Sequence, residues 1–392
     1  MGAMREFTVP DYYAEFECKG GACRRTCCQG WPISLSMAEY FRLLGMDCSP
    51  ELRRKLDGAF HLADSPSPER YAQISPNWRG DCPLHLENGY CQLQCECGPE
   101  ALSAICRMYP RSPRATFRPE CACSNSCERT LELLFARRDP LRFVTLPLEF
   151  DPPVPSDVPE ALKRGYLPVR RLCVDLLQDR ARPLPVRLAR LGAALRFLSD
   201  DFKSLDESRI AAALDALPDL PEADELPAPD ERFALSFLSH INRSFGLSSA
   251  SVGDYAQFAC EKLGLGRGEP SEDALNRFRE SKARFRALRP DWEILFEQAL
   301  VNHVFYESFP FSDRLESLWD EFLSLSAVYA YFAFLTALWA AERPTDGELI
   351  AVASAAFRLI GHSAFDFNTA AILGARLRVT LAQAQGMILG AL

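Results

Sequence analysis

Cysteines are the residues of this chain whose number and spacing point most directly to chemistry. Thirteen of the fifteen lie between residues 18 and 127. Twelve of them form three groups, which are Cys18, Cys23, Cys27 and Cys28; then Cys82, Cys91, Cys95, Cys97 and Cys106; then Cys121, Cys123 and Cys127. Thiolates on neighbouring turns can converge on one centre, and Gly20, Gly21 and Gly30 allow the backbone of the first group to bend tightly. The pattern predicts a metal–thiolate domain.

The start of the chain argues against a disulfide framework. Arg5, Glu6 and Asp11 stand where the apolar core of a secretory signal would have to lie. We therefore expect a cytoplasmic, reducing compartment, in which clustered cysteines serve as metal ligands or redox groups. For the isolated Cys48, Cys173 and Cys260 we expect ordinary buried thiols.

The spacing of the first group favours iron–sulfur over zinc. Structural zinc sites use paired Cys-x-x-Cys or Cys/His knuckles. Here four residues separate Cys18 from Cys23, three separate Cys23 from Cys27, and Cys28 follows directly. All-thiolate ligation with irregular spacing suits a [4Fe–4S] cluster, which takes four cysteines. Zinc stays open as an alternative, because thiolates bind both metals.

Two regions of different composition must position these cysteines. The N-terminal region contains many Pro and Gly residues, so its elements should be short. Within it we predict a helix from the Ser36 cap through Leu44, a second over 100–107, and a third from Ser126 through Phe135. After it, apolar residues recur at helical spacing, as in Leu188, Leu191, Leu195 and Leu198.

The sequence therefore predicts a mainly α protein in two parts. A loop-rich, cysteine-rich metal-binding domain covers 5–146, and an all-helical domain covers 160–392. A proline-rich joint at 147–159 separates them, and an acidic joint at 218–230 subdivides the second domain. Further helices are predicted over 206–216, 252–263, 272–287, 291–307, 314–342, 346–361 and 366–384.

Charge and hydropathy limit the partners. The formal charge of −9 argues against a nucleic-acid backbone. The segment 322–341 has no charged residue and is long enough to cross a bilayer. Its Ser, Thr, Tyr and Ala residues make it only weakly apolar on an insertion scale, so we predict a buried central helix and no membrane partner.

A resemblance to a known family appears at the cysteines. The opening motif of the flagellin lysine-N-methylase family resembles three segments of this chain, namely Tyr12 to Cys18, Cys23, and Thr26 to Trp31. That family belongs to a wider group of zinc- or iron-chelating proteins. The family's next motifs resemble Cys82-Pro83-Leu84, residues 88–91, and the run from Cys106 to Arg111. A later motif of the family resembles Cys127-Glu128. Weaker similarity continues over 297–311 and 357–367, the latter including His362.

The resemblance implies an enzyme that uses S-adenosylmethionine to methylate lysine side chains of flagellin, with a [4Fe–4S] cluster in the cofactor site. The cysteines it assigns are Cys18, Cys23, Cys27, Cys28, Cys82, Cys91, Cys106 and Cys127. Eight is too many for one cluster, so some brace the site or a second centre exists. Cys95, Cys97, Cys121 and Cys123 go beyond the family pattern and are candidates for that second centre.

Methyl transfer to an amine suggests roles for other residues near the cysteines. A neutral lysine and a sulfonium are both favoured by an aromatic, water-poor channel. Tyr12, Tyr13 and Tyr109 are therefore candidate catalytic residues, and Trp31, Arg107 and Arg111 are candidates for binding the cofactor. For each of these side chains, ordinary core packing or a surface ion pair is the competing interpretation. His303 and His362 are predicted to be core or interface histidines.

Two absent motifs keep other functions open. The third cysteine of a radical-type C-x-x-x-C-x-x-C triplet is replaced by Gly30, and no strand precedes the GLGRG run at 264–268, so no dinucleotide-type fingerprint is present. Binding of S-adenosylmethionine would need another route, such as a cluster iron that chelates its amino and carboxylate groups. The alternatives are a non-enzymatic iron- or zinc-binding carrier or adaptor, and an iron–sulfur redox protein.

Overall fold

The chain begins in a strand that joins distant parts of the sequence. In the computed structural model, which describes residues 4–155, 157–312 and 315–392, β1 (Arg5–Pro10) lies inside a four-stranded sheet of order β5-β6-β1-β7. It runs parallel to β6 (Glu120–Cys123) and antiparallel to β7 (Phe143–Leu148), while β5 (Arg111–Arg114) pairs antiparallel with β6. Phe7 and Val9, two residues apart, are fully buried on one face, as strand geometry requires.

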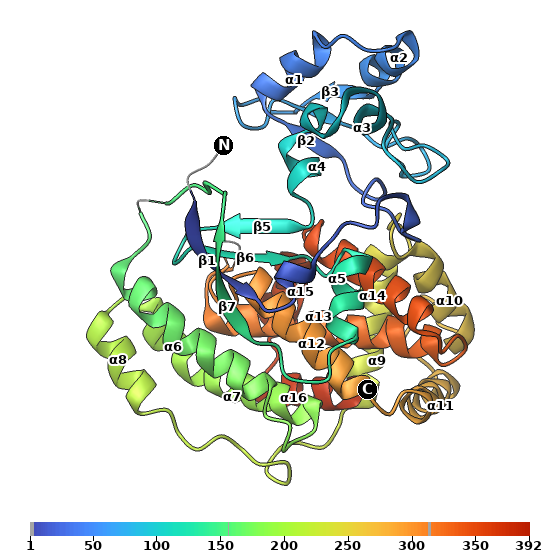
Figure 1. Cartoon of the computed structure of the whole chain (residues 1–392). Helices are drawn as coiled ribbons and strands as arrows, with labels where there is room; N and C mark the ends of the chain where they lie inside the picture. Colours follow the sequence, from blue (N-terminus) through green and yellow to red (C-terminus); the bar gives the residue numbers. More distant parts are fainter. Residues whose placement is uncertain (1–3, 156, 313–314) are drawn as a thin grey trace.

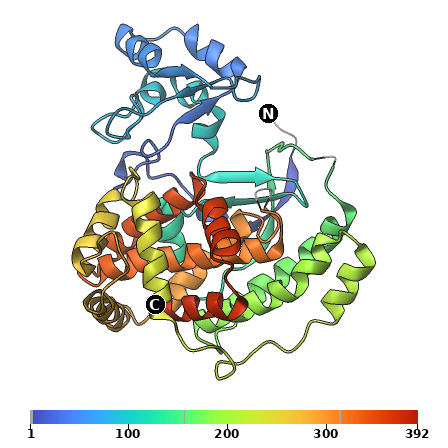
Figure 2. The same cartoon turned by 180° about the vertical axis from the view of Figure 1, so that it is seen from behind.

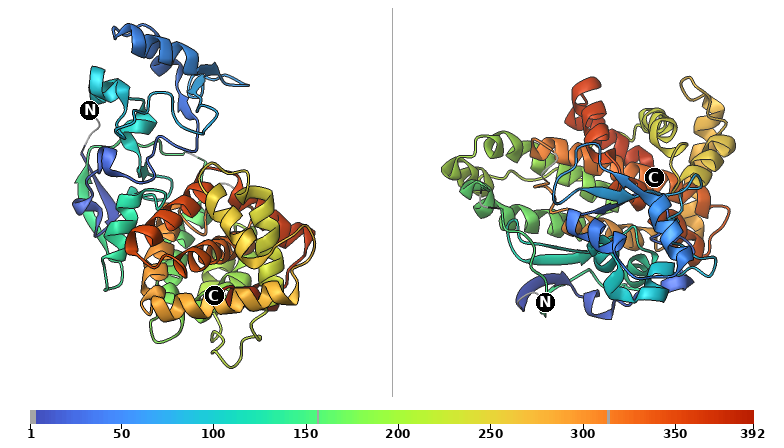
Figure 3. Two further views of the ribbon diagram at one scale, coloured as in Figure 1. Left: turned by 90° about the vertical axis from the view of Figure 1, so that its right-hand side faces the viewer. Right: turned by 90° about the horizontal axis from the view of Figure 1, so that it is seen from above.

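A small module follows β1 and stands apart from the rest of the molecule (Figures 1 and 3). Its three short antiparallel strands have the order β2-β4-β3, over Ile33–Leu35, Ala72–Ile74 and Phe60–Leu62. Its helices are α1 (Met37–Leu44), α2 (Pro50–Ala59), α3 (Gln92–Cys97) and α4 (Ala104–Met108). Leu35, Leu43, Leu52 and Leu56 form its own buried cluster, separate from the main core.

The larger part of the molecule is a helical body seen from both sides in Figures 1 and 2. Helix α5 (Glu128–Phe135) leads from the sheet to it. The remaining helices are α6 (Glu160–Leu177), α7 (Leu184–Lys203), α8 (Glu207–Asp215), α9 (Glu231–Ile241), α10 (Gly253–Leu263), α11 (Glu272–Leu288), α12 (Trp292–Tyr306), α13 (Leu318–Ala340), α14 (Asp346–Gly361), α15 (Phe365–Ala371) and α16 (Leu381–Ala391). Five-residue π-helical turns extend α9 and α15.

Helix α13 is the centre of this body. It is long and apolar enough to cross a membrane by composition, and α14 with the segment 365–376 passes the same test only as a pair bent by 74°. In the structure α13 packs against α7, α9, α10, α11, α14, α15 and α16. Nearly every side chain from Leu318 to Ala340 is buried within the protein. The predicted buried central helix is confirmed.

Most predicted helices are present, and several begin or end at the capping residues that the sequence indicates. Ser36 and Glu39 form a reciprocal capping box at α1. Gly264 ends α10 in the left-handed conformation (φ +69°), so the GLGRG run is a helix C-terminal loop, as predicted. The acidic joint at 218–230 contains no helix or strand. The division into domains at 146–160 stays a prediction.

The prediction of an N-terminal region made only of loops and helices was wrong in one respect, because it omitted both sheets. Most of the strands have three or four residues, too few for a two-residue alternation to stand out. Two of them also contain a proline that was interpreted as a loop signal, Pro113 in β5 and Pro147 in β7. Both strands lie at the edges of the sheet, where the missing N–H of proline is tolerated.

Two helix predictions need correction as well. The helix expected over 366–384 is interrupted, because α15 and its π turn end at Arg376 and α16 begins only at Leu381, capped by Thr380. The helix expected over 100–107 is a short 3₁₀ turn (Pro99–Ala101) followed by α4, which Ser103 caps. In both places a Ser or Thr accepts a backbone hydrogen bond and restarts the helix.

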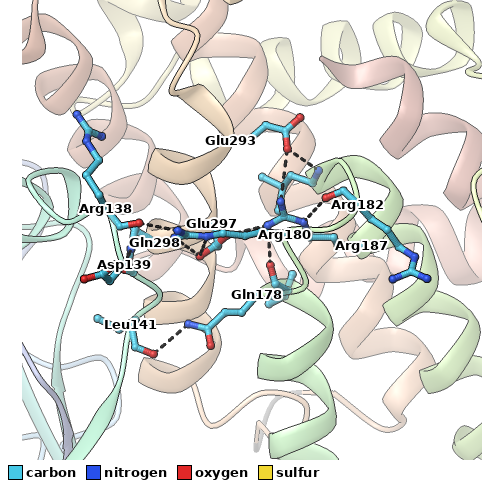
Figure 4. A network of polar contacts seen from close by, with 12 residues as sticks. Arg138, Asp139, Leu141, Gln178, Arg180, Arg182, Arg187, Glu293, Glu297 and Gln298 are labelled. Carbon is cyan, nitrogen blue, oxygen red and sulfur yellow. Dashed lines mark hydrogen bonds and ion pairs between the residues drawn. The ribbon is translucent and has the colours of Figure 1, made fainter.

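A buried polar network joins the sheet region to the helices (Figure 4). Glu297 of α12 is almost fully buried and pairs with Arg180 at 2.8 Å and Arg187 at 2.7 Å. The neighbouring Gln298 donates to the carbonyl of Asp139 at 2.6 Å. Such a network is costly if one member is removed, because the remaining charge is left buried without a partner. It fixes α12 against α6, α7 and the loop after α5.

Candidate functional site

The eight cysteines assigned by the family resemblance all line one cavity. Its volume is about 430 Å³, and its wall includes Cys18, Cys23, Cys27, Cys28, Cys82, Cys91, Cys106 and Cys127. They come from the loop after β1, from the small module and from the N-terminus of α5, so the cavity lies where the module meets the body. All fifteen cysteines of the chain are free thiols. Cys18, Cys27 and Cys106 keep accessible surface because they face this open cavity.

The other seven cysteines are not part of this wall. Cys121 and Cys123 are buried in the main core on β6, whereas Cys97 packs against the separate core of the small module. The two Cys-x-Cys pairs therefore lie in different parts of the fold. This arrangement does not favour a second centre built from Cys95, Cys97, Cys121 and Cys123.

Glycines allow the cysteine loop to follow the cavity wall. Gly20 and Gly30 have φ of +57° and +96°, which side chains rarely adopt. Gly21 lies against the 88–90 turn, and a Cβ there would meet the carbonyl oxygen of Asn88 at 2.5 Å. The bends expected at these glycines are confirmed.

Two buried charged residues hold the loop to the body. Glu128, at the start of α5, accepts hydrogen bonds from the backbone N–H of Arg24, at 3.0 Å, and of Arg25. Arg358 of α14 donates to the carbonyl oxygens of Thr26 at 2.8 Å and Arg25 at 3.1 Å. Arg358 also donates to the carbonyl oxygen of Ser126 at 3.1 Å. Both charges line the cavity, so the loop geometry and the electrostatics of the site come from the same side chains.

Arg358 is an unusual cation because backbone carbonyl oxygens accept its hydrogen bonds. Among the described residues no acidic side chain forms an ion pair with it, and its Nε is buried without a hydrogen-bond partner. Only 3% of its surface is exposed. A buried guanidinium is expensive unless it is paired. Its position beside the thiols fits a cavity that receives negative charge.

Seven of the eight cavity thiols fall into two sets by their mutual electrostatic effects, and the eighth, Cys28, forms a hydrogen bond with Cys27 that raises the pKa of Cys27. Burial raises the pKa of Cys82 to about 12 and that of Cys106 to about 11, and for both thiols Cys27 and Cys91 raise it further. We call Cys27, Cys82, Cys91 and Cys106 the four-thiol set.

The second set lies at the other side of the loop. Burial raises the pKa of Cys23 to about 12, and Glu128, Cys127 and Cys18 add to the rise. Burial also raises the pKa of Cys127, with a smaller contribution from Cys18. We call Cys18, Cys23 and Cys127 the three-thiol set. These raised pKa values keep Cys23, Cys82, Cys106 and Cys127 protonated, and a bound metal would favour their thiolate forms.

The donor set fits a thiolate-bound metal by chemical type and number. In the part of the chain that the structure describes, however, no group of three or more Cys, His, Asp or Glu side chains is arranged to hold a metal ion. The thiols are instead spread around the cavity wall. A single zinc ion needs four donors within about 2.3 Å of one point.

Aromatic and basic side chains complete the wall. Trp31 lies with its ring centroid 5.1 Å from that of Tyr109 and 3.7 Å from that of His362. Arg111 stacks over Phe16 with its guanidinium carbon 4.8 Å from the ring centroid. Trp31, Tyr109, Arg107 and Arg111, all predicted from the sequence, therefore lie together at the cavity. Arg107 is exposed and forms an ion pair with Glu100 at 3.0 Å. A surface ion pair was the alternative to cofactor binding for this residue.

Tyr12 and Tyr13 lie outside the cavity wall. The hydroxyl of Tyr12 donates to Oδ1 of Asn302 at 2.7 Å and accepts from the backbone N–H of Cys123 at 3.2 Å. Cys121 donates to the hydroxyl of Tyr13 at 3.4 Å. Burial raises the pKa of both tyrosines. Their contacts join β1 to β6 and α12, behind the cavity rather than in it.

Four residues of the site were not singled out from the sequence, or were given another role. Arg358 was not selected, and Glu128 and Ser126 were named only within a motif and as the start of a helix. His362 was predicted to be a core or interface histidine and is exposed at the end of α14. Arg358 did carry a signal, because it is a lone charge in an otherwise apolar stretch of helix, 349–361. Ser126 carried none, because a serine beside a cysteine cluster is unremarkable.

Comparison with known proteins bears on the same regions. The family model described as the FliB lysine N-methylase C-terminal domain matches residues 170–371. Two proteins named lysine-N-methylase, from Salmonella typhimurium and Salmonella choleraesuis, are each 25% identical over 372 residues, which cover 87% of this chain and 88% of the relative. The flagellar biosynthetic protein FliU of Salmonella muenchen is 31% identical over 112 residues, 28% of this chain and 65% of that protein. No solved structure matches.

Proposed function

The chain belongs to the FliB lysine N-methylase family of enzymes, and from this premise we propose that it transfers methyl groups from S-adenosylmethionine to lysine side chains of flagellin. The similarity to a flagellar biosynthetic protein supports flagellin as the substrate. The observation that carries the proposal is the cavity, because the eight cysteines of the family motif line it together. We place the reaction there.

We further propose that the four-thiol set holds a [4Fe–4S] cluster. A cluster of this kind takes four cysteine thiolates. Cys27, Cys82, Cys91 and Cys106 all line the cavity, and charge on one of these thiols affects the others. With three of these four thiols as ligands, the cluster would keep one iron free of thiolate and would supply Lewis-acid binding of the amino and carboxylate groups of the methyl donor. The cation of Arg358 would offset part of the negative charge of the thiolates.

The other wall residues serve the displacement at the sulfonium methyl. The lysine amine must be neutral and in line with the methyl group. The rings of Phe16, Trp31 and Tyr109 exclude water, which lowers the pKa of a lysine that enters. Their faces also favour the sulfonium cation of the donor. Arg111 is the basic residue placed to attract the donor's carboxylate, because it lines the cavity and stacks on Phe16.

The test is methylation of purified flagellin by the iron-loaded protein. Flagellin from cells lacking the enzyme is incubated with S-adenosylmethionine, and its lysines are examined by mass spectrometry. We expect new methyl-lysine with the wild type, and loss of both bound iron and activity in Cys27→Ser and Cys91→Ser. Cys97→Ser is the matched control, because Cys97 lies in the same module but does not line the cavity. It should keep both.

Other outcomes separate the alternatives. Iron-loaded protein that leaves flagellin unmethylated would reject the methylase and favour a metal carrier. A cluster that cycles between redox states without binding S-adenosylmethionine would favour a redox protein. Full methylation by protein free of iron would reject the cluster while keeping the methylase.

A further inference from the structure

Lysine methylation produces a proton that must leave the cavity. A lysine ammonium and a sulfonium become a methyl-lysine ammonium, a thioether and one free proton, so each turnover releases one proton near the wall described above. This reasoning rests on the proposed function. Two carboxylates line the cavity. Glu128 is occupied by the backbone N–H groups of Arg24 and Arg25, and Glu100 pairs with Arg107. Neither is placed to accept this proton.

A hydrogen-bonded chain leads from the cavity wall to an exposed imidazole. The hydroxyl of Tyr109 lies 3.0 Å from Oγ of Ser126. The same Oγ lies 3.3 Å from Nε2 of His362. Tyr109 lines the cavity, Ser126 is fully buried, and His362 is exposed. Three side chains, of which His362 is 236 positions from Ser126, thus form a path between the cavity and solvent.

The surrounding structure holds each member of the path in place. The ring of His362 contacts the ring of Trp31, with the two planes tilted by 45°. The backbone N–H of His362 closes the end of α14 by donating to the carbonyl oxygen of Arg358. Ser126 lies in the turn before α5, where its carbonyl accepts from Arg358 and its hydroxyl lies 2.8 Å from that of Ser124. Helices α5 and α14 pack directly on each other. Ser126 precedes α5 and His362 follows α14, so the packing of these two helices sets the distance between Ser126 and His362.

We propose that Tyr109, Ser126 and His362 form a proton relay that carries the lysine proton from the cavity to solvent. The ammonium gives a proton to the hydroxyl oxygen of Tyr109 as the tyrosine proton passes to Oγ of Ser126. The serine proton passes to Nε2 of His362, whose imidazolium then releases a proton to water. Each hydroxyl gains one proton and loses one, so only the lysine and the imidazole change charge.

The charges around the path fit a relay of neutral hydroxyls. Burial is the main cause that raises the pKa of Tyr109, with a contribution from Cys127, while Arg358 opposes the rise. Tyr109 therefore keeps its proton and passes it on without accumulating as an anion. The charged and titratable groups that act on Tyr109 are Arg358 on α14, Cys127 at the start of α5 and Cys27 in the cysteine loop. Histidine is the side-chain type whose ordinary change of charge lies nearest neutral pH, so a path that ends on an imidazole can release protons to water there.

The test compares His362→Ala with His61→Ala in the iron-loaded protein. His61 is an exposed histidine on β3 and does not line the cavity, so it is the matched control. We expect His362→Ala to lower kcat by about 100-fold, at the lower end of what proton transfer by side chains contributes. In the wild type kcat should fall in mildly acidic solution, where imidazole takes up a proton. That acidic fall should be absent in His362→Ala, and added imidazole should restore part of its rate.

Ser126→Ala and Tyr109→Phe test the path itself. Both interrupt it before the imidazole, so added imidazole should not rescue them. A wild type that leaves flagellin unmethylated overturns the proposed function and the relay together. A wild type that methylates flagellin beside a His362→Ala variant with the same kcat and pH profile overturns the relay alone. A reduced rate with an unchanged pH profile and no rescue would mean that His362 only supports Trp31, which also overturns the relay.

Discussion

At the scale of single residues, Arg358 shows how one side chain can set both the shape and the charge of the site. Its terminal nitrogens donate to backbone carbonyls of the cysteine loop and of Ser126, so its charge is hydrogen-bonded but not neutralised. The hydrogen bond with Cys28 and burial raise the pKa of Cys27, and Arg358 opposes that rise. The positive charge therefore acts on a thiol that we assign to the metal. Arg358 links the part of the chain that the family model matches to the cysteines outside it.

Glu321 yields a prediction about pH and stability. Burial raises the pKa of this α13 carboxyl to about 7, and Ser312 donates to it from its backbone N–H at 3.0 Å. The unfolded carboxyl titrates near about 4.3. Between these values the native state holds a proton that the unfolded state has released, so this stabilisation is present in acid and is lost as pH rises through 7. We expect Glu321→Gln to remove the dependence.

Urea unfolding of both proteins at pH 4.5 and pH 8 measures this difference. The free energy of unfolding of the wild type relative to Glu321→Gln should fall by about 3 kcal/mol over that interval, because one pKa unit corresponds to about 1.4 kcal/mol. The difference between the two proteins cancels the titration of other groups. A constant difference across the interval would mean that Glu321 is ionised in the folded protein at both pH values.

The sequence predicted the wall of the site better than its supports. The eight cysteines that the family resemblance assigned line the cavity, and so do Trp31 and Tyr109, which were selected for their aromatic rings. Tyr12 and Tyr13 are near in sequence but contact β6 and α12, since β1 carries them into the main core. Ser126 and Arg358 are brought to the cavity by packing between α5 and α14, a contact between residues more than two hundred positions apart. No local pattern contains that information.

At the scale of elements, the cysteine loop depends on close contact between two backbones. Gly21 and Gly89 approach so closely that a Cβ on Gly89 would meet the carbonyl oxygen of Gly21 at 2.6 Å. We expect Gly21→Ala to lower the free energy of unfolding by about 1–3 kcal/mol, because the neighbouring turn must move. Gly58 near the end of α2 is the matched control. A Cβ there meets nothing within 4 Å, so Gly58→Ala should be neutral or stabilise by up to about 1 kcal/mol.

Chemical denaturation of both variants provides the measurement. Opposite signs would show that close approach, and not loss of glycine flexibility alone, determines the effect at Gly21. Equal and small changes at both positions would contradict the close contact of the two loops. Alkylation of the cavity cysteines should also become faster in Gly21→Ala, because the displaced loop opens the wall.

Helices and strands differed in how well local pattern revealed them. Long apolar periods and clear caps, as in α1 and α14, marked their helices. In the sheet of β1, β5, β6 and β7, the strand β1 depends on pairing between residues about 110 to 140 positions apart, such as Thr8 with Glu120 and with Thr145. Short strands have little intrinsic preference, and their burial by neighbours decides their conformation. Sequence periodicity therefore found the body and missed the sheet on which the cysteine loop begins.

At the scale of the whole molecule, the cavity lies between two separate cores. The small module has its own buried cluster, and the sheet with the helical body has another. The four-thiol set takes Cys82, Cys91 and Cys106 from the module and Cys27 from the loop that Arg358 holds to the body. A metal centre bound by this set would therefore cross-link the two parts. Since a metal binds the folded site and not the unfolded chain, its binding free energy adds to the stability of the parts that it joins.

Removing the metal should therefore loosen one part of the molecule more than the other. Hydrogen exchange followed by mass spectrometry is compared between iron-loaded protein and the same protein stripped with a chelator. We expect faster exchange in residues 18–30 and 82–106, whereas α7 and α13 keep their protection because their packing does not involve the cavity. Cys91→Ser is the control, and without chelator it should already match the stripped wild type. Uniform acceleration across the body, or none in the two cysteine segments, would show that the centre does not join the module to the body.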